Sequence, residues 1–174
     1  MRKIKMLSKA DMVKGQGVLS AHDEQVALVK KVMKGKAQIL ENKKNPCEIT
    51  HYHSINPEYY LSISKAKAQG AAVGYVHFLP ETVENSISLP RWAKNVFYKY
   101  MISFYKRMDY LVIVNPVFIE KLVNYGIPRN KVTYIPNVVS EERFYPLPRE
   151  KRAVIRKRCR IPEEKFTVLC VGQL

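Results

Sequence analysis

The residues best suited to chemistry on a phosphorylated ligand form a short glycine loop, Gly15-Gln16-Gly17, which precedes a helical pattern. Glycine lets backbone N–H groups approach a ligand closely, and a helix N-terminus favours an anion such as a diphosphate. The loop is neither a G-x-G-x-x-G fingerprint nor a Walker loop, because Ser20 stands at the third glycine position. The spacing fits a diphosphate-binding loop, and it equally fits a flexible connection with turn glycines.

A second candidate is His77, which lies near the end of the most apolar segment of the chain, Ala71–Leu79. At the carboxyl end of a central strand, a polar side chain points toward the ligand crevice of an α/β sheet. The alternative is a core histidine that bonds to the backbone. His51 and His53 share a face at another predicted strand end, but no cysteine or carboxylate stands beside them at metal-ligand spacing. We therefore expect no metal site.

A third candidate is a predicted helix, Pro90–Met108, that combines cations with aromatic side chains and contains no acidic residue. On a helical wheel, one arc should face the sheet, and it holds Ala93, Phe97, Tyr100, Met101, Phe104 and Met108. The remaining positions carry Arg91, Trp92, Lys94, Tyr98, Lys99, Ile102, Lys106 and Arg107. Interleaved cations and aromatics are typical of a helix that lies on an anionic bilayer, where each cation contributes about 1 kcal/mol. An ordinary basic surface helix with buried aromatics is the alternative.

The composition limits the class of protein. Lys and Arg number 30 against 15 Asp and Glu, so the net charge of +15 calls for an anionic partner. With 47% hydrophobic residues the chain is not disordered. Its three cysteines show neither metal nor redox spacing, which indicates reduced thiols in a reducing compartment. We expect no signal peptide and no membrane span, because no apolar run approaches about 18 residues.

Short apolar runs alternate with helical patterns along the chain. Strands are predicted at Ile4–Leu7, Cys47–His51, Ala71–Leu79, Tyr110–Val114, Lys131–Ile135 and Phe166–Val171. Helices are predicted at Val18–Val32, Pro57–Gln69, Pro90–Met108, Pro116–Gly126 and Arg149–Arg160, with Asn115 as the cap before Pro116. This alternation predicts an α/β fold, a Rossmann-like and mostly parallel sheet with helices on both faces. Ligands then bind beyond the carboxyl ends of the strands.

The chain also divides by composition. Residues 1–140 hold the alternating pattern, residues 141–164 are polar and rich in proline, and residues 165–174 read as a buried strand that enters a glycine loop. We interpret these parts as one domain, an interdomain linker and the start of a second domain. On this interpretation the chain is the first half of a larger protein.

Several ordered motifs resemble the N-terminal domain of retaining glycosyltransferases of family 4, which have the two-domain type B fold. Within that family the chain looks most like bacterial diacylglycerol glucosyltransferases. The resemblance rests on the Gly15–Gly17 loop and on the stretches His77-Phe-Leu-Pro-Glu81, Ile102-Ser-Phe-Tyr-Lys106, Val114-Asn-Pro116, Tyr125-Gly-Ile-Pro128 and Val132-Thr-Tyr-Ile-Pro-Asn137.

The resemblance implies transfer of glucose from a nucleotide-sugar, expected to be UDP-glucose, to a diacylglycerol or glycosyl-diacylglycerol with retention. Gly15, Gln16 and Gly17 would approach the donor diphosphate. His77 would contact the donor sugar and stabilise developing charge, while Glu81 and Asn115 would lie in the cleft.

For the remainder of the chain, the resemblance implies that the basic helix docks a cytoplasmic, peripheral enzyme on the inner face of the plasma membrane. Neither a cofactor nor a metal is implied. The family's nucleotide-binding half lies in the second domain, so we expect this chain alone to be inactive.

A non-catalytic basic module that binds anionic membrane or nucleic acid is the alternative. The charge of +15 supports it without any resemblance. The chain has no RNA-binding or helix-turn-helix signature, so no nucleic-acid partner is expected.

Overall fold

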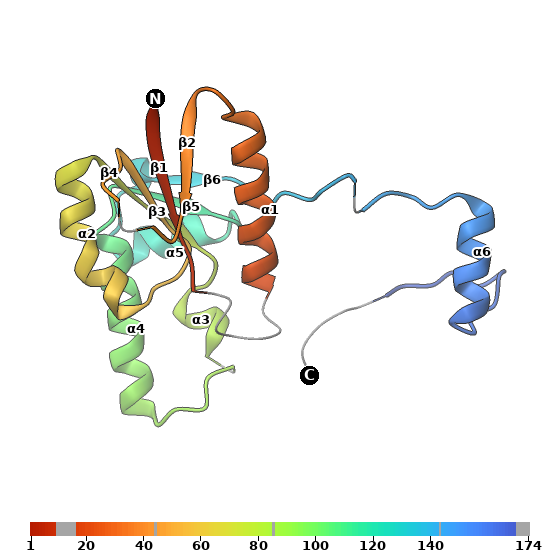
Figure 1. Cartoon of the computed structure of the whole chain (residues 1–174). Helices are drawn as coiled ribbons and strands as arrows, with labels where there is room; N and C mark the ends of the chain where they lie inside the picture. The colour runs from red at the N-terminus through yellow and green to blue at the C-terminus, as the bar shows by residue number, and fades with distance from the viewer. Residues whose placement is uncertain (10–16, 44, 85, 143, 170–174) are drawn as a thin grey trace. The chain divides into compact units, whose positions relative to one another are not determined.

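The computed structural model describes residues 1–9, 17–43, 45–84, 86–142 and 144–169. The chain forms two compact units, Met1–Val138 and Val139–Leu174. Figure 1 shows the first unit as a sheet with packed helices and the second as a single helix with its flanking segments.

The first unit is built on a six-stranded sheet in which every strand pair is parallel. Its order is β2-β1-β3-β4-β5-β6. The strands are β1 (Arg2–Leu7), β2 (Ala37–Glu41), β3 (Ile49–Tyr52), β4 (Ala71–Val76), β5 (Tyr110–Ile113) and β6 (Val132–Tyr134). The order reverses between β1 and β3, and ligands of open α/β sheets bind beyond the strand ends at such a switch point.

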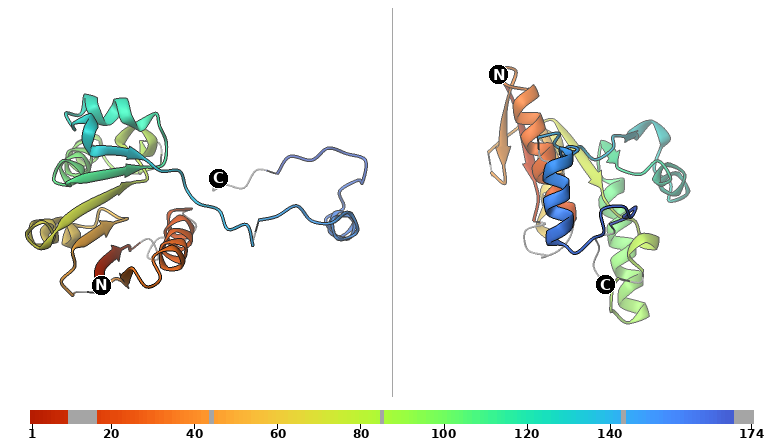
Figure 2. Two further views of the ribbon diagram at one scale, coloured as in Figure 1. Left: turned by 90° about the horizontal axis from the view of Figure 1, so that it is seen from above. Right: turned by 90° about the vertical axis from the view of Figure 1, so that its right-hand side faces the viewer.

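Helices cover both faces of this sheet, as the alternation predicts (Figures 1 and 2). On one face, α2 (Pro57–Gln69), α4 (Arg91–Lys106) and α5 (Phe118–Asn124) pack on side chains such as Tyr52 and Val76. On the other face, α1 (Gly17–Val32) places His22 against His53. Side chains alternate between the two faces of a strand, so adjacent residues of β3 belong to different layers.

The main core lies between the sheet and α2, α4 and α5. Its fully buried side chains include Tyr52, Ile63, Met101, Phe104 and Tyr105. Tyr52 meets Phe104 edge to face, with ring centroids 6.0 Å apart. The second half of α4 is therefore a wall of the core: Met101, Phe104 and Met108 belong to the predicted arc, whereas the buried Tyr105 lies outside it.

Two elements differ from the expectations. β2 was not predicted from the sequence. The last predicted strand is wrong over Phe166–Leu169, where the chain is extended without strand pairing, and its residues 170 and 171 lie outside the described part. Phe166 and Leu169 are 94% and 83% exposed. A strand needs a neighbouring strand to satisfy its backbone, and no described strand lies in this unit.

The junction of α2 and β4 requires glycine at position 70. A Cβ there would lie 2.0 Å from the carbonyl oxygen of Glu48, and the same oxygen accepts a hydrogen bond from the Ala71 N–H at 2.9 Å. We expect Gly70→Ala to destabilise the fold by about 3 kcal/mol, since backbone has to move. Chemical denaturation measures this, with Gly35→Ala as a comparison: a Cβ at Gly35 meets no atom within 4 Å, so only the cost of an alanine at φ +77°, about 1 kcal/mol, is expected there. Equal stability of Gly70→Ala and wild type would contradict the close approach.

Candidate functional site

All four histidines of the sequence meet at the carboxyl ends of β3 and β4. We call His22, His51, His53 and His77 the four-histidine cluster. His53 is its centre, because its ring contacts the other three. Residues separated by up to 55 positions thus form one group, and their spacing along the sequence gives no sign of it.

The strand geometry explains how the cluster forms. His51 and His53 are two residues apart and share a face, and Tyr75 and His77 do the same along β4. The Tyr52–Gly74 register sets the two pairs side by side. The Tyr75 ring contacts both His53 and His77, with centroid distances of 4.8 Å and 4.7 Å.

Hydrogen bonding in the cluster is incomplete. His53 Nε2 and His51 Nδ1 are 3.2 Å apart, and His22 Nδ1 lies 3.2 Å from a carboxylate oxygen of Asp23. Other nitrogens of the cluster have no hydrogen-bond partner in the described part of the chain. Within the described residues, three buried nitrogens have no partner: His22 Nε2, His53 Nδ1 and His77 Nε2. An unpaired buried nitrogen is costly, so these atoms are available to a polar ligand or water.

Burial keeps His51, His53 and His77 uncharged near neutral pH. It lowers the pKa of His51 and of His77 from the ordinary 6.5 to about 4, and repulsion from His22 acts in the same direction. The pKa of His53 falls further, again chiefly because the ring is buried. A neutral imidazole can accept or donate one hydrogen bond at each nitrogen. No group of three or more His, Cys, Asp or Glu in the described ranges is arranged to hold a metal.

The segment after β4 fixes the position of His77. The Tyr105 hydroxyl donates to the carbonyl oxygen of Phe78 at 3.1 Å, and Leu79 is fully buried. The short helix α3 (Pro80–Val83) follows, and the Thr82 hydroxyl accepts from the Leu79 N–H at 2.9 Å. The backbone around His77 is therefore anchored on both sides.

Glu81 and Asn115 do not join the cluster. Glu81 accepts a hydrogen bond of 2.7 Å from the Tyr125 hydroxyl, and burial together with this carboxylate raises the pKa of Tyr125 to about 12. Asn115 follows β5, and its side-chain oxygen accepts from the Val117 N–H at 3.0 Å. It thus caps a turn, and α5 begins at Phe118 instead of Pro116. Both residues have structural partners, and their predicted cleft roles stay predictions.

The predicted diphosphate loop is only partly described. Gly17 is the first residue of α1, as a loop that opens a helix requires. Gly15 and Gln16 lie outside the described residues. The role of the loop therefore stays a prediction.

The cations of α4 point in several directions. Arg91, Lys99 and Lys106 are exposed. Lys94 donates to the carbonyl oxygen of Glu84 at 2.7 Å. Arg107 lies beyond the helix end with its guanidinium 4.4 Å from the centre of the Tyr60 ring, so it ties α4 to α2.

The apolar residues of the predicted membrane surface differ in their exposure. Trp92 is 72% exposed, whereas Ile102 is 8% exposed, so the prediction that Ile102 faces outward is wrong. Ile102 instead lines a hollow of about 380 Å³ together with Pro80, Tyr98 and Tyr125. Tyr98 is half-buried, and its hydroxyl has no partner among the described residues. Helices α3 and α5 cover this side of α4, which a helical wheel cannot reveal.

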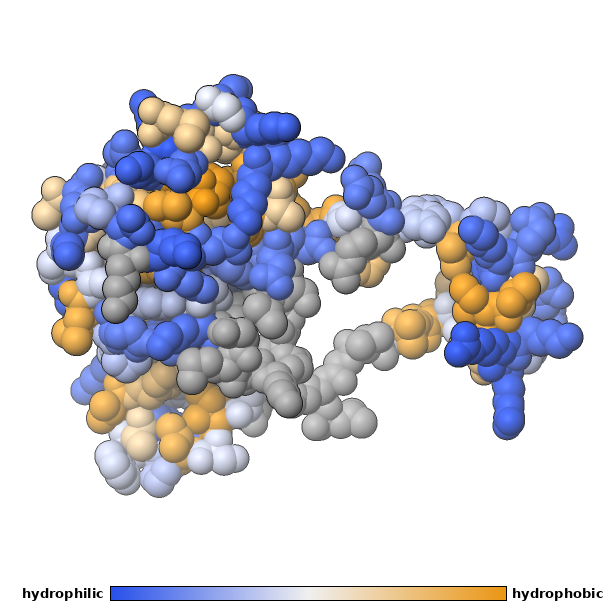
Figure 3. All heavy atoms as spheres, in the orientation of Figure 1, coloured by the Kyte–Doolittle hydropathy of each residue, from blue (hydrophilic) through white to orange (hydrophobic). Residues whose placement is uncertain are grey.

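The structure adds two side chains to the exposed start of α4. Leu89 and Val96 are 46% and 61% exposed beside Trp92. Figure 3 shows apolar groups gathered over this end of the first unit. The spacing of Trp92 and Val96 is the one feature of the sequence that indicates this exposed apolar surface, because residues four positions apart share a helix face. No helix of the described residues is both long and apolar enough to cross a membrane.

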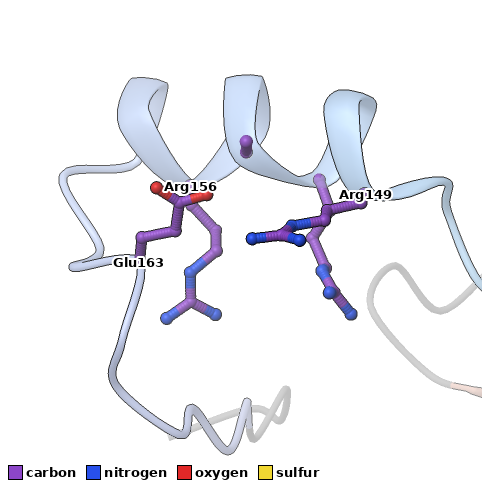
Figure 4. A pocket seen from close by; sticks show the side chains of 5 residues that line it. Arg149, Arg156 and Glu163 are labelled. Atoms are coloured by element: carbon purple, nitrogen blue, oxygen red, sulfur yellow. The ribbon is translucent and has the colours of Figure 1, made fainter.

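The second unit carries its own basic group on α6 (Arg149–Arg158). Arg149, Arg152 and Arg156 line a hollow of about 370 Å³ with Glu163 (Figure 4). Arg156 donates through Nε to the carbonyl oxygen of Pro162 at 3.1 Å, so it holds the following segment against the helix. Apart from the half-buried Ala153 and Arg156, the side chains of α6 are exposed, which is typical of a solvated helix.

Comparison with known protein families identifies one family. A family model described as Glycosyltransferase Family 4 matches residues 33–143. The chain is 44% identical, over 99% of its length, to a protein of Streptococcus pneumoniae (strain ATCC BAA-255 / R6) named Alpha-galactosylglucosyldiacylglycerol synthase. It spans 46% of that relative.

Solved structures share the fold. Crystal structures of Anabaena Alr3699/HepE in complex with UDP-glucose, and with UDP and glucose, each match with a TM-score of 0.58. The match covers 91% of this chain and 50% of those chains at 10% identity. At that identity the likeness concerns the fold alone.

Proposed function

Because this chain belongs to Glycosyltransferase Family 4, we propose that it supplies the acceptor-side and membrane-facing part of a glycosyltransferase that makes a glycolipid. The proposed reaction transfers a hexose from a nucleotide-sugar to a diacylglycerol or glycosyl-diacylglycerol hydroxyl, with retention at the anomeric carbon. UDP-glucose is the expected donor, and the name of the streptococcal relative makes UDP-galactose the donor to compare.

The observation that carries this proposal is the state of His77. It lies next to the carboxyl end of β4, is uncharged at neutral pH, and has a buried Nε2 without a partner in the described structure. In the proposed reaction, this nitrogen contacts the donor sugar as charge develops at the anomeric carbon. Gly15, Gln16 and Gly17 approach the diphosphate, and Glu81 and Asn115 border the cleft.

The proposed domain boundaries follow the sequence. Residues 1–140 form the Rossmann-like domain, residues 141–164 the linker, and residues 165–174 belong to the nucleotide-sugar domain. The division of the chain after Val138 supports the first boundary. Because the relative is about twice as long, we expect the 174-residue chain alone to show no transfer.

A chimera tests the activity. Residues 1–174 replace the segment of the streptococcal relative that they match, and glycolipid formation is measured with UDP-glucose, UDP-galactose and two acceptors, diacylglycerol and glucosyl-diacylglycerol. The proposal expects transfer with one donor and an α-linked product. A folded chimera that makes no glycolipid with any pair would count against it, since the parent relative serves as the positive control.

Membrane docking through the first turns of α4 is the second part of the proposal. The exposed apolar tip of Leu89, Trp92 and Val96 stands beside Arg91 and Lys99. Apolar side chains insert at the headgroup boundary while cations meet anionic lipid. The enzyme would then be peripheral on the inner face of the plasma membrane.

We expect the variant Arg91→Glu/Lys99→Glu to bind anionic vesicles at least about tenfold more weakly, because each cation contributes about 1 kcal/mol at the surface. Co-sedimentation with phosphatidylglycerol vesicles measures this. Lys34→Glu/Lys36→Glu makes the same charge change at exposed positions in the turn before β2 and should bind normally. Trp92 fluorescence should shift to the blue on anionic vesicles, and equal loss in both variants would exclude docking through α4.

The alternative, a basic module for nucleic acid, rests on the charge of +15. A gel shift with random DNA and RNA separates the two. Strong salt-sensitive binding of nucleic acid without vesicle binding would favour the module.

A further inference from the structure

A hollow of about 670 Å³ lies between β1, β3 and α2, away from the four-histidine cluster. It exists because the described part of the connection from β2 to β3 contains no helix, while α2 packs on β3 and β4. The side of β1 next to α2 is therefore not filled. Ligand pockets in proteins measure about 300–1,000 Å³, so the hollow has the size of a binding site.

One wall of the hollow is apolar. It is formed by buried side chains of β1 and α2, namely Leu7, Tyr59 and Ala66, which are 9%, 9% and 6% exposed. Tyr59 and Ala66 lie seven residues apart and so share one face of α2. This wall suits a hydrocarbon chain.

The remainder of the lining is strongly basic. Lys9 forms an ion pair with Glu58. The other three lining lysines, Lys5, Lys43 and Lys65, have no ion pair in the described part of the chain. An uncompensated set of cations at an apolar wall attracts an anionic ligand.

A buried hydroxyl also lacks a partner here. Thr50 of β3 lines the hollow, is 2% exposed, and its Oγ1 has no hydrogen-bond partner within the described residues. Neighbouring hydroxyls are satisfied, since Ser62 pairs with Tyr52 at 3.0 Å. An unpaired buried hydroxyl is costly, and a ligand oxygen that accepts its proton removes that cost.

We infer that this hollow binds one acyl chain of an anionic glycerophospholipid. The chain lies along the apolar wall, the ester carbonyl accepts from the Thr50 hydroxyl, and the phosphate meets the unpaired lysines. These three features of the lining match the three parts of such a lipid, whereas a nucleotide or sugar phosphate leaves the apolar wall unused. The site is independent of the proposed transferase activity and of docking through α4.

The test uses the 174-residue chain and soluble probes in monomeric form. Lauroyl lysophosphatidylglycerol carries the chain, the ester and the phosphate. Lauroylglycerol lacks the phosphate, glycerol 3-phosphate lacks the chain, and dodecyl phosphate lacks the ester. Calorimetric titration should rank the lysophospholipid first, with lauroylglycerol at least about tenfold weaker, since hydrogen bonds to charged groups are the stronger ones. Glycerol 3-phosphate and UDP should not bind measurably.

Matched variants locate the site. Lys43→Glu/Lys65→Glu should weaken the lysophospholipid at least about tenfold, and Lys34→Glu/Lys36→Glu, an equal charge change elsewhere, should leave it unchanged. Thr50→Val keeps the shape and should weaken the ester probe about threefold to tenfold, yet leave dodecyl phosphate unaffected. Trp92→Ser should have no effect, because that side chain belongs to α4.

Each other outcome overturns the inference. Equal affinity for lauroylglycerol and the lysophospholipid would show simple apolar adsorption. Weaker binding of the lysophospholipid by the Trp92→Ser variant would place the lipid on α4. Tight binding of UDP or glycerol 3-phosphate would mean a phosphate site for another class of ligand.

Discussion

His77→Ala in the chimera with the streptococcal relative should lower kcat at least about 100-fold, because removal of one group that stabilises transition-state charge typically costs that much. The chain should stay folded with a modest loss of stability, since the buried Nε2 of His77 has no described hydrogen-bond partner to lose and only the ring contacts with Tyr75 and His53 are removed. Steady-state kinetics with the active donor measures the first effect, and thermal unfolding of the 174-residue chain measures the second.

A conservative replacement sharpens this test. His77→Gln keeps a polar group near the same place, so it should retain more turnover than His77→Ala if hydrogen bonding to the sugar matters. Tyr134→Ala changes a side chain that is 46% exposed on β6 and serves as a control. Near-normal kcat for a folded His77→Ala variant would remove His77 from the proposed site.

Acidification from pH 7 to pH 5 should destabilise the first unit by about 6 kcal/mol, with about 2 kcal/mol from each of His51, His53 and His77. The folded-state pKa of His51 and of His77 is about 4, and burial lowers the pKa of His53 still further below the ordinary 6.5. The unfolded chain therefore binds more protons below pH 6.5, and stability falls as the pH drops from that value toward 4. His22 and Asp23 are further ionisable side chains beside these rings.

Urea denaturation at pH 7, 6 and 5 measures this loss. Between pH 7 and pH 5 the change in stability reports mainly on histidines, because ordinary carboxylates titrate near pH 4. His51→Gln should reduce the loss by about a third, since it removes one of three titrating rings. Equal stability of the wild-type chain at pH 7 and pH 5 would mean that the rings reach solvent and titrate normally.

Much of the fold follows from local signals. The helix Pro57–Gln69 has the predicted bounds, because Pro57 starts it and Gly70 ends it. The family resemblance drawn from the ordered motifs is confirmed by the match over residues 33–143. β2 was missed because Ala37–Glu41 has only a weak alternation and its burial depends on pairing with β1.

The candidate site was predictable only in part. His77 was identified from its place at a strand end, but its partners were not. His22 reaches the cluster from α1, and that contact depends on how a helix crosses a sheet. Likewise Ile102 is covered by neighbouring helices that a wheel of α4 does not contain. Long-range packing, more than local propensity, decides such positions.

Helix α4 is buried in the core of the first unit at one end and exposed at the other. Its second half is fixed in the core by Met101, Phe104 and Tyr105, which are at most 2% exposed, while its first turns carry Trp92 outward. A helix of 16 residues is a stiff rod of about 24 Å. Any surface that engages its first turns therefore sets the tilt of the whole sheet as well. The packing of α4 in the core, and not the contact itself, therefore sets the angle at which the strand ends and their histidines face that surface.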